Sequence, residues 1–307
     1  MDLVATAPRI PVVGETIIGT KYFTEPGGKG ANQAYAAALL GGSVAMLGRI
    51  GDDEFGREMR DNLVKVGCDV SGIRSVPGAS GVALIFVADN GQNSIIVVPG
   101  ANDAFAPEHI AQDGTQLRGA QIVLLQLENP VPTVVAAAKA ARIASAKVIL
   151  DPAPAPASPL PAELLREIDI ITPNETEAAM LANLPPGTLN PTQAVAIARK
   201  LQAMGAASVI VKLGSQGCVS VGAANPTLFP APRVNAIDTT AAGDVFGAAL
   251  GVALSEGLDT ARACYFANHA AALSVTRLGA QVAVPSRAEV DQFLKTAQAG
   301  AAIALEG

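Results

Sequence analysis

Hydrophobic and polar residues follow two different patterns along this chain. Between residues 81 and 98, two apolar runs at 81–87 and 94–98 are separated by Asp89-Asn90-Gly91, a typical hairpin signal. No helical pattern lies between these two runs. We therefore expect a small antiparallel β appendage in this part of the chain.

After residue 120, strand patterns alternate strictly with helical ones. The expected strands are 122–127, 147–150, 169–172 and 208–213, and the expected helices are about 131–145, 161–167, 174–183 and 191–204. Such alternation predicts an α/β fold with a parallel sheet covered by helices on both faces. Ligands of these sheets bind beyond the carboxyl ends of the strands.

The flanking regions complete a single predicted domain over residues 1–307. Before the hairpin we expect a helix from Gly30 or Ala31 to the glycines at 41–42, a strand at 44–50 and a helix at 54–66. Residues 1–4 resemble the end of a strand or the loop after it. Toward the C-terminus we expect an antiparallel pair at 218–221 and 227–229, then helices at about 242–256, 259–276 and 286–297.

Composition narrows the class of protein. The 307 residues are 50% hydrophobic and 16% charged, which allows a large core and argues against long disordered regions. A net charge of −6 argues against a nucleic-acid partner. Three cysteines without CxxC or CxxH spacing argue against a zinc site or a disulfide framework and fit a cytoplasmic protein. There is no signal peptide and no long uninterrupted apolar run, so no membrane association is expected.

Residues 238–244 read DTTAAGD and lead directly into an apolar helix. The small residues leave the backbone uncovered, and free N–H groups at a helix N-terminus attract anions such as phosphate. Asp244 then places a carboxylate beside this anion hole, where it is suited to accept a proton from an attacking hydroxyl. The alternative is that Asp244 is only a favourable first-turn acid and Asp238 only a turn residue.

Polar residues also follow the predicted parallel strands. They are Glu128 after the first, Asn174 and Glu177 after the third, and Gly214, Ser215, Gln216 and Gly217 after the fourth. Each has an ordinary structural explanation: a helix-start acid, a capping box, or a tight turn. All of them, however, are expected at the sheet edge where the 238–244 loop must lie.

A second glycine motif, GGKGANQA, occupies residues 27–34. It is not a Walker A loop, because glycine follows the lysine, and there is no GxGxxG fingerprint. The glycines would allow a small polar ligand to lie against the backbone, with Lys29 and Asn32 bound to its hydroxyls. The alternative is a flexible turn before a helix.

Together these two motifs resemble the two signatures of the ribokinase-like family, the phosphofructokinase B type of carbohydrate and purine kinases. The resemblance covers nearly the whole chain and is greatest toward the ribose kinases of the family. It extends to the segments LQLE at 125–128, PAPA at 152–155, TPNETE at 172–177 and VTRLGAQ at 275–281. It implies a three-layer αβα fold with a mostly parallel sheet and a small β lid made of about 11–28 and 81–102.

The resemblance also implies roles for individual residues. Asp244 would be the catalytic base, with an anion hole formed by the N–H groups of Ala241, Ala242 and Gly243. The sugar hydroxyls would be bound by Asp2, Gly28, Lys29, Asn32 and Glu128. ATP would contact Asn174, Lys212, Leu213, Gly214, Ser215, Gln216, Gly217, Gly243 and Asn268.

Two ions are implied as cofactors. Glu177 would position the water shell of Mg²⁺. A monovalent cation, K⁺, would be surrounded by Asp238, Thr240, Ser274, Arg277, Gly279 and Ala283, largely through backbone carbonyls.

Three features depart from the family pattern. The first strand of the family is expected to be missing before Met1, with only its final aspartate, Asp2, retained. Lys212 stands where ribose kinases often have threonine, and Ala283 lacks a side-chain oxygen.

The function implied is ATP-dependent phosphorylation of D-ribose at its 5-hydroxyl, by a homodimer that pairs through the lid. Alternatives are a family kinase for another sugar, a sugar acid or a nucleoside, and a non-catalytic sugar or nucleotide sensor. The low aromatic content, 4%, disfavours a base-stacking nucleoside pocket.

Overall fold

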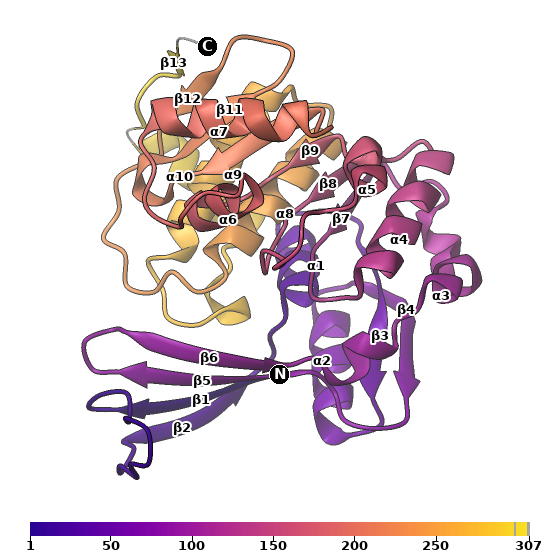
Figure 1. The fold of residues 1–307 in the computed structure, drawn as a ribbon, viewed down its shortest axis with the longest axis vertical. Helices are drawn as coiled ribbons and strands as arrows, with labels where there is room; N and C mark the ends of the chain where they lie inside the picture. The colour runs from indigo at the N-terminus through magenta and orange to yellow at the C-terminus, as the bar shows by residue number, and fades with distance from the viewer. Residues whose placement is uncertain (298, 306–307) are drawn as a thin grey trace.

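The computed structural model describes residues 1–297 and 299–305, and its largest element is a seven-stranded sheet (Figure 1). The strand order is β13-β12-β11-β10-β9-β8-β7. Strands β7 to β10 are parallel and β10 to β13 antiparallel, so the sheet is mixed and the predicted α/β class is confirmed. The bounds are β7 Ile122–Leu125, β8 Lys147–Leu150, β9 Ile170–Ile171, β10 Ser208–Lys212, β11 Cys218–Val221, β12 Thr227–Phe229 and β13 Ile303–Ala304.

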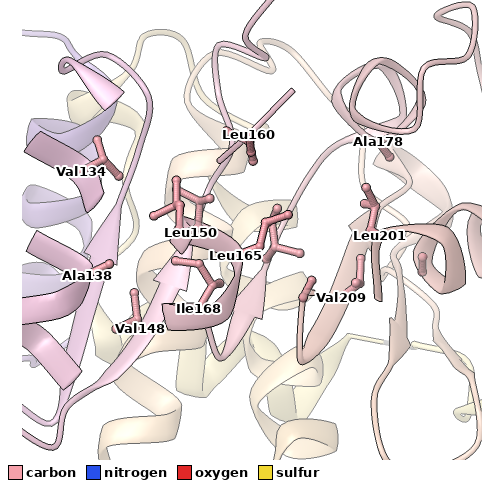
Figure 2. Close-up of a cluster of buried hydrophobic side chains, with 14 of the residues drawn as sticks. Val134, Ala138, Val148, Leu150, Leu160, Leu165, Ile168, Ala178, Leu201 and Val209 are labelled. Carbon is pink, nitrogen blue, oxygen red and sulfur yellow. The ribbon is translucent and has the colours of Figure 1, made fainter. Parts of the chain in front are cut away.

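The sheet is buried on both faces because its central strands carry runs of consecutive apolar residues, such as 148–150 in β8 and 209–211 in β10. Along β8, Val148 and Leu150 point into one hydrophobic cluster, whereas Ile149 between them points into another. This follows from the two-residue period of a strand. Figure 2 shows the first cluster, in which side chains of β8 meet Val134 and Ala138 of a covering helix.

Helices form the two outer layers, which gives the predicted αβα arrangement (Figure 1). One layer consists of α4 Val131–Ile143, α5 Ala162–Glu167, α6 Glu175–Leu181 and α7 Pro191–Ala203. The other consists of α1 Lys29–Leu39, α8 Ala242–Ser255, α9 Thr260–Ser274 and α10 Arg287–Thr296. Within the described part of the chain, no helix is both long and apolar enough to cross a membrane.

Helix α8 lies at the centre of its layer. It is apolar on nearly all sides and packs against α1, α9 and β7. Gly251 permits the approach to the sheet, because a Cβ there would lie 3.2 Å from Leu124 Cδ2. This packing fixes the N-terminal end of α8, which carries the 238–244 loop.

A separate four-stranded sheet of order β2-β1-β5-β6 lies where the appendage was predicted (Figure 1). The prediction of a purely antiparallel sheet is wrong, because β1 and β5 pair in parallel. Its strands are β1 Asp2–Ala7, β2 Lys21–Glu25, β5 Val82–Ala88 and β6 Asn93–Val98. The prediction of a strand end or loop at residues 1–4 is wrong, since β1 pairs along its length with both β2 and β5. The lid predicted over 11–28 and 81–102 therefore also includes β1.

A third, two-stranded parallel sheet joins β3 Ala45–Gly51 and β4 Asp69–Val76 beside α2 Glu54–Lys65. A cavity of about 550 Å³ lies between β3 and β7, lined by residues 44–47 and 121–126. Strands β3 and β7 are both edge strands of their sheets. The expectation of a further strand before Met1 stays a prediction. The remaining elements are α3 Pro107–Asp113, η1 Gly100–Ala104, η2 Gly114–Leu117, η3 Gly214–Gln216 and η4 Gln281–Ala283.

Candidate active site

The loop before α8 has the open backbone that the sequence predicts. Ala241 adopts a left-handed conformation with φ of 56°, which costs a non-glycine residue about 1–2 kcal/mol. Among the described residues, the N–H groups of Ala241 and Gly243 make no hydrogen bond. The Ala242 N–H donates to Thr239 O at 3.2 Å, so this member of the predicted anion hole is already engaged.

Asp244 is buried directly behind this loop, with 4% of its surface exposed. Its carboxylate accepts hydrogen bonds from Asn32 Nδ2 at 3.0 Å and Gln33 Nε2 at 3.3 Å. Burial raises the pKa of Asp244 to about 6, while the nearby Lys29 ammonium opposes that rise. The carboxylate is therefore ionised at neutral pH, and its proton affinity is close to the one that suits a general base.

The Lys29 loop meets Asp244 across a short gap. Lys29 begins α1, and its backbone N–H donates to Glu128 Oε2 at 2.8 Å. Asp2 lies against Gly27, where a Cβ would be 2.3 Å from the Asp2 carboxyl carbon. Although burial alone would lower the pKa of Lys29, the carboxylates of Asp244, Asp151 and Glu128 hold that pKa above its usual value. These polar groups line one region, as expected for a site that binds hydroxyls.

A cavity of about 790 Å³ continues from this region past the N-terminus of α8. It is lined by most of the residues predicted to contact ATP, namely Asn174, Lys212, Gly214, Ser215, Gly217, Gly243 and Asn268. Leu213 and Gln216, which were also predicted to contact ATP, do not line the cavity. Leu213 is 2% exposed within the core, and Gln216 Nε2 donates to Leu189 O.

Asn174 and Glu177 form the capping box that their spacing predicts at the start of α6. Both also line the cavity, so the structural role does not exclude a binding role. Burial raises the pKa of Glu177. Among the described residues, no group of three or more His, Cys, Asp or Glu side chains could hold a metal ion directly. A single carboxylate acting through water is consistent with that finding.

The residues predicted to surround a monovalent cation are partly brought together. Asp238 accepts hydrogen bonds from Thr240 N and Oγ1 and from Gly279 N, all between 2.7 and 2.9 Å. Burial would raise the pKa of Asp238, but these hydrogen bonds hold it below its usual value. The Ser274 hydroxyl donates to Ala271 O and the Arg277 guanidinium pairs with Glu289. The Arg277 side chain, a cation itself, would not bind the ion, whereas the Ser274 hydroxyl oxygen keeps lone pairs that can.

Three buried polar side chains next to Asp244 have no predicted role, namely Gln33, Gln126 and Asp151. Gln33 Nε2 donates to both Asp244 and Asp151 Oδ2, the latter at 3.2 Å, and Gln126 Nε2 donates to Gln33 Oε1 at 2.5 Å. Lys212 Nζ donates to Asp151 Oδ1 at 2.9 Å. We call these five side chains (Gln33, Gln126, Asp151, Lys212 and Asp244) the polar floor of the site. A sequence signal did exist for Asp151, since it is a carboxylate directly after a buried strand.

The chain is similar to known proteins over nearly its whole length. The model of the pfkB family carbohydrate kinases matches residues 1–287. A ribokinase of Bacillus subtilis is 41% identical over 295 residues, with 96% of each chain covered. A deoxyribokinase of Salmonella typhi is 36% identical, covering 96% of this chain and 95% of the relative. A solved structure of Arabidopsis thaliana ribokinase with ribose and ATP superimposes with a TM-score of 0.88 at 38% identity, covering 96% and 95% of the two chains.

Proposed function

Because the chain belongs to the pfkB family of carbohydrate kinases, we propose that it transfers the γ-phosphoryl group of ATP to the 5-hydroxyl of D-ribose. The products are ribose 5-phosphate and ADP. The observation that carries this proposal is the position of the Asp244 carboxylate, between the Lys29 loop and the open N-terminus of α8. The full-length similarity to ribokinases supports the choice of sugar.

Asp244 acts as the base in the proposed reaction. As the sugar oxygen attacks the γ-phosphorus, its proton passes to the Asp244 carboxylate. The bond from the γ-phosphorus to the bridging oxygen breaks, and its electron pair leaves with ADP. The free N–H of Gly243 and the positive end of α8 stabilise the negative charge on the transferred group.

Lys29, Asn32, Glu128 and Asp2 orient the sugar. The carboxylates of Asp2 and Glu128 accept hydrogen bonds from hydroxyls, and the Lys29 ammonium donates one. Burial withdraws the Glu128 carboxylate from water and raises its pKa. A bound sugar hydroxyl would donate a hydrogen bond that this carboxylate does not receive from solvent. Precise alignment matters because phosphoryl transfer needs little covalent help from the protein.

Both implied ions fit residues of this chain. Glu177 would hold Mg²⁺ through water at the phosphate end of the larger cavity, where the ion would neutralise charge on ATP. Asp238 and Gly279 would contribute to a K⁺ site beneath the 238–244 loop. In that position the ion would fix the shape of the loop without touching either substrate.

A second sugar has a specific observation in its favour. A deoxyribokinase aligns with 96% of this chain at an identity similar to that of several ribokinases. Phosphorylation of 2-deoxy-D-ribose is therefore the first alternative. Another sugar, a sugar acid or a nucleoside remains a further alternative, and the last is a sensor that binds without transfer.

An ADP-release assay separates these possibilities. The purified protein is given ATP, Mg²⁺ and K⁺ with D-ribose, 2-deoxy-D-ribose, D-fructose, a hexonic acid or adenosine, and the phosphorylated position is identified by NMR. We expect the highest kcat/KM with D-ribose and phosphate on its 5-oxygen. A higher value with any other acceptor would overturn the choice of sugar. Binding of ribose without ADP release would favour the sensor.

The same proposal includes a cytoplasmic homodimer paired through the lid. Support comes from strand β6, whose Ile95, Ile96 and Val97 are more than half exposed. Large exposed apolar patches on a soluble protein commonly mark contact surfaces. The oligomeric state is tested below.

A further inference from the structure

Lys212 lies where a phosphoryl group would arrive. It is the last residue of β10, and a Cβ on Gly243 would lie 3.2 Å from its Nζ atom. The ammonium thus stands at the N-terminal end of α8, beside the backbone N–H groups of the anion hole. Its side chain is 12% exposed.

This position is electrostatically unfavourable for a cation in the absence of an anion. The N-terminus of a helix carries a partial positive charge, so it repels an ammonium group. Burial adds a desolvation cost, which a single ion pair does not always recover. Asp151, with its side chain 5% exposed, accepts a hydrogen bond from Lys212 Nζ at 2.9 Å. This ion pair partly compensates for the helix repulsion and for the desolvation cost.

An ammonium group has three N–H donors. In the described part of the structure, Lys212 Nζ donates one hydrogen bond, to Asp151. Two donors therefore remain available, and Lys212 lines the 790 Å³ cavity together with Gly243. Oxygens of a phosphoryl group at the anion hole would lie within hydrogen-bonding reach of the Lys212 ammonium and of the Gly243 N–H.

Lys212 also separates negative charges. Asp151, Asp244 and Glu177 all face the region where the transferred group would lie, and Lys29 and Arg233 are further cations along the same cavity. Without Lys212, an arriving triphosphate would meet the Asp151 carboxylate directly. The lysine covers that carboxylate and presents a positive charge in its place.

The geometry points to Lys212 as a second catalytic cation, which binds the transferred γ-phosphoryl group through its ammonium and is held in place by the positioning residue Asp151. This inference deepens the proposed function and rests on it. In the step itself Lys212 keeps its proton. It stabilises charge on the γ-phosphoryl oxygens while the sugar oxygen bonds to phosphorus and ADP departs with the electron pair.

Gln33 connects this pair to the base. Its Nε2 atom donates to Asp151 and to Asp244, at 3.2 and 3.3 Å. The cation and the base are thus supported by one side chain, which fixes their separation. Because such an arrangement is sensitive to small displacements, Asp151 is expected to affect turnover without touching substrate.

Binding measurements with two nucleotides test the role of Lys212 most directly. For Lys212→Met we expect the affinity for a non-hydrolysable ATP analogue to fall at least about 10-fold, because a hydrogen-bonded charge is lost. The affinity for ADP, which lacks the γ-phosphate, should change less than about 2-fold, as should that for D-ribose. Isothermal titration calorimetry measures all three without turnover. Equal losses for the analogue and ADP would overturn the inference.

Turnover provides the second readout. Lys212→Met should lower kcat by about 10²-fold or more, the effect of losing one donor to the developing charge. Lys212→Arg should retain more activity than Lys212→Met, because it keeps the charge. Asp151→Asn should lower kcat while leaving ribose KM near its original value. A kcat for Lys212→Met within about 3-fold of the parent would contradict the assignment.

Two further variants guard against misfolding and non-specific effects. Lys212→Met combined with Asp151→Asn removes both buried charges and keeps the test available if the single variant fails to fold. Lys139→Met removes the lysine of a surface lysine–carboxylate pair with Glu163 and should leave every measured value unchanged. If the parent protein phosphorylates no sugar, the proposed function fails, whereas the comparison of ATP analogue with ADP still decides whether Lys212 binds the γ-phosphate.

Discussion

The polar floor and the lid form two sides of one site, and they are built in opposite ways. The floor consists of buried polar side chains at the carboxyl edge of a fully covered sheet, where Asp151 and Asp244 are each 4% exposed. The lid is a sheet with apolar side chains turned to solvent, including Ile96 at 57% exposure. The floor is therefore fixed by the core, whereas the lid has no core of its own.

From this contrast we expect the floor and the lid to have different roles. Charged groups that act on the phosphoryl group need a rigid, dry environment, which only the floor provides. Asp2, which is proposed to bind the sugar, lies on β1 of the lid. If the contrast is functional, changes in the floor should alter turnover, and changes in the lid should alter assembly with little effect on folding.

The largest expected effect comes from the floor. Asp244→Asn should lower kcat by about 10²–10⁴-fold, the usual loss for a general base, because the amide cannot take the proton. Ribose binding measured by calorimetry should be largely retained. Glu54→Gln, which changes another first-turn acid, is the matched control and should have no such effect. Near-normal kcat for Asp244→Asn would leave Asp244 as only a helix-start acid.

The pH profile of kcat/KM for ribose should also depend on Asp244. The pKa of Asp244 in the ligand-free chain, about 6, sets the acid limb, so kcat/KM should fall about 10-fold per pH unit below pH 6. The profile is measured at ribose concentrations well below KM. An acid limb near pH 4, the ordinary range of an aspartate, would show that the Asp244 carboxylate is not the group that titrates.

The buried negative charge of Asp244 should lower the free energy of unfolding of the protein. The pKa of Asp244 is raised from 3.8 to about 6 in the folded chain, so as pH rises the unfolded chain ionises first. Stability is then lost between pH 3.8 and 6 and stays lower above that range. Two pH units correspond to at most about 3 kcal/mol.

Asp244→Asn removes this cost and should therefore unfold at higher urea concentration than the parent at pH 8. At pH 4 the difference should largely disappear. A variant that is less stable than the parent at pH 8 would contradict this account of the buried charge.

A smaller effect on turnover is expected from the 238–244 loop. If K⁺ binds at Asp238, turnover should be higher in K⁺ buffer than in Na⁺ buffer at equal ionic strength. Asp238→Asn should abolish the difference, because the carboxylate no longer links Thr240 to Gly279. Equal rates in the two salts would count against a selective cation site.

The smallest effect on folding is expected in the lid. Ile96→Lys should change the free energy of unfolding by less than about 0.5 kcal/mol, as for most surface substitutions. It should nevertheless convert a dimer to a monomer in light scattering. Ile143→Lys, at an exposed position on α4, is the control that should leave assembly intact. A dimer that survives Ile96→Lys would place the subunit contact elsewhere.

Much of the fold could be predicted because the central strands contain unbroken apolar runs and the helices between them are strongly periodic. Strands β11 and β12 have the predicted bounds. Strand β4 was not predicted, because Gly72 and Arg74 interrupt its apolar pattern and only one neighbouring strand supports it. Strand β1 was assigned wrongly because its pairing partners, not its own sequence, make it a strand.

The proximity of Lys29 and Asp244 could be predicted, because each residue lies in a short motif. The floor was harder to predict, because Gln33 contacts Asp151 and Asp244 across separations of 118 and 211 residues. A glutamine inside a helix gives no local sign of such contacts. The position of the Leu213 side chain was hard to predict for another reason, since the loop motif gave no indication that this side chain packs in the core.

The gap between β3 and β7 has a consequence for the exchange of backbone amide hydrogens with solvent. Within the residues that the structure describes, each of these strands is hydrogen-bonded to a neighbouring strand on one side only, whereas β8 and β9 are paired on both sides. Amides on the unpaired sides of β3 and β7 should therefore exchange faster than those of β8 and β9. In this protein, the most readily exchanging strands beside the site would then lie in neither its floor nor its lid.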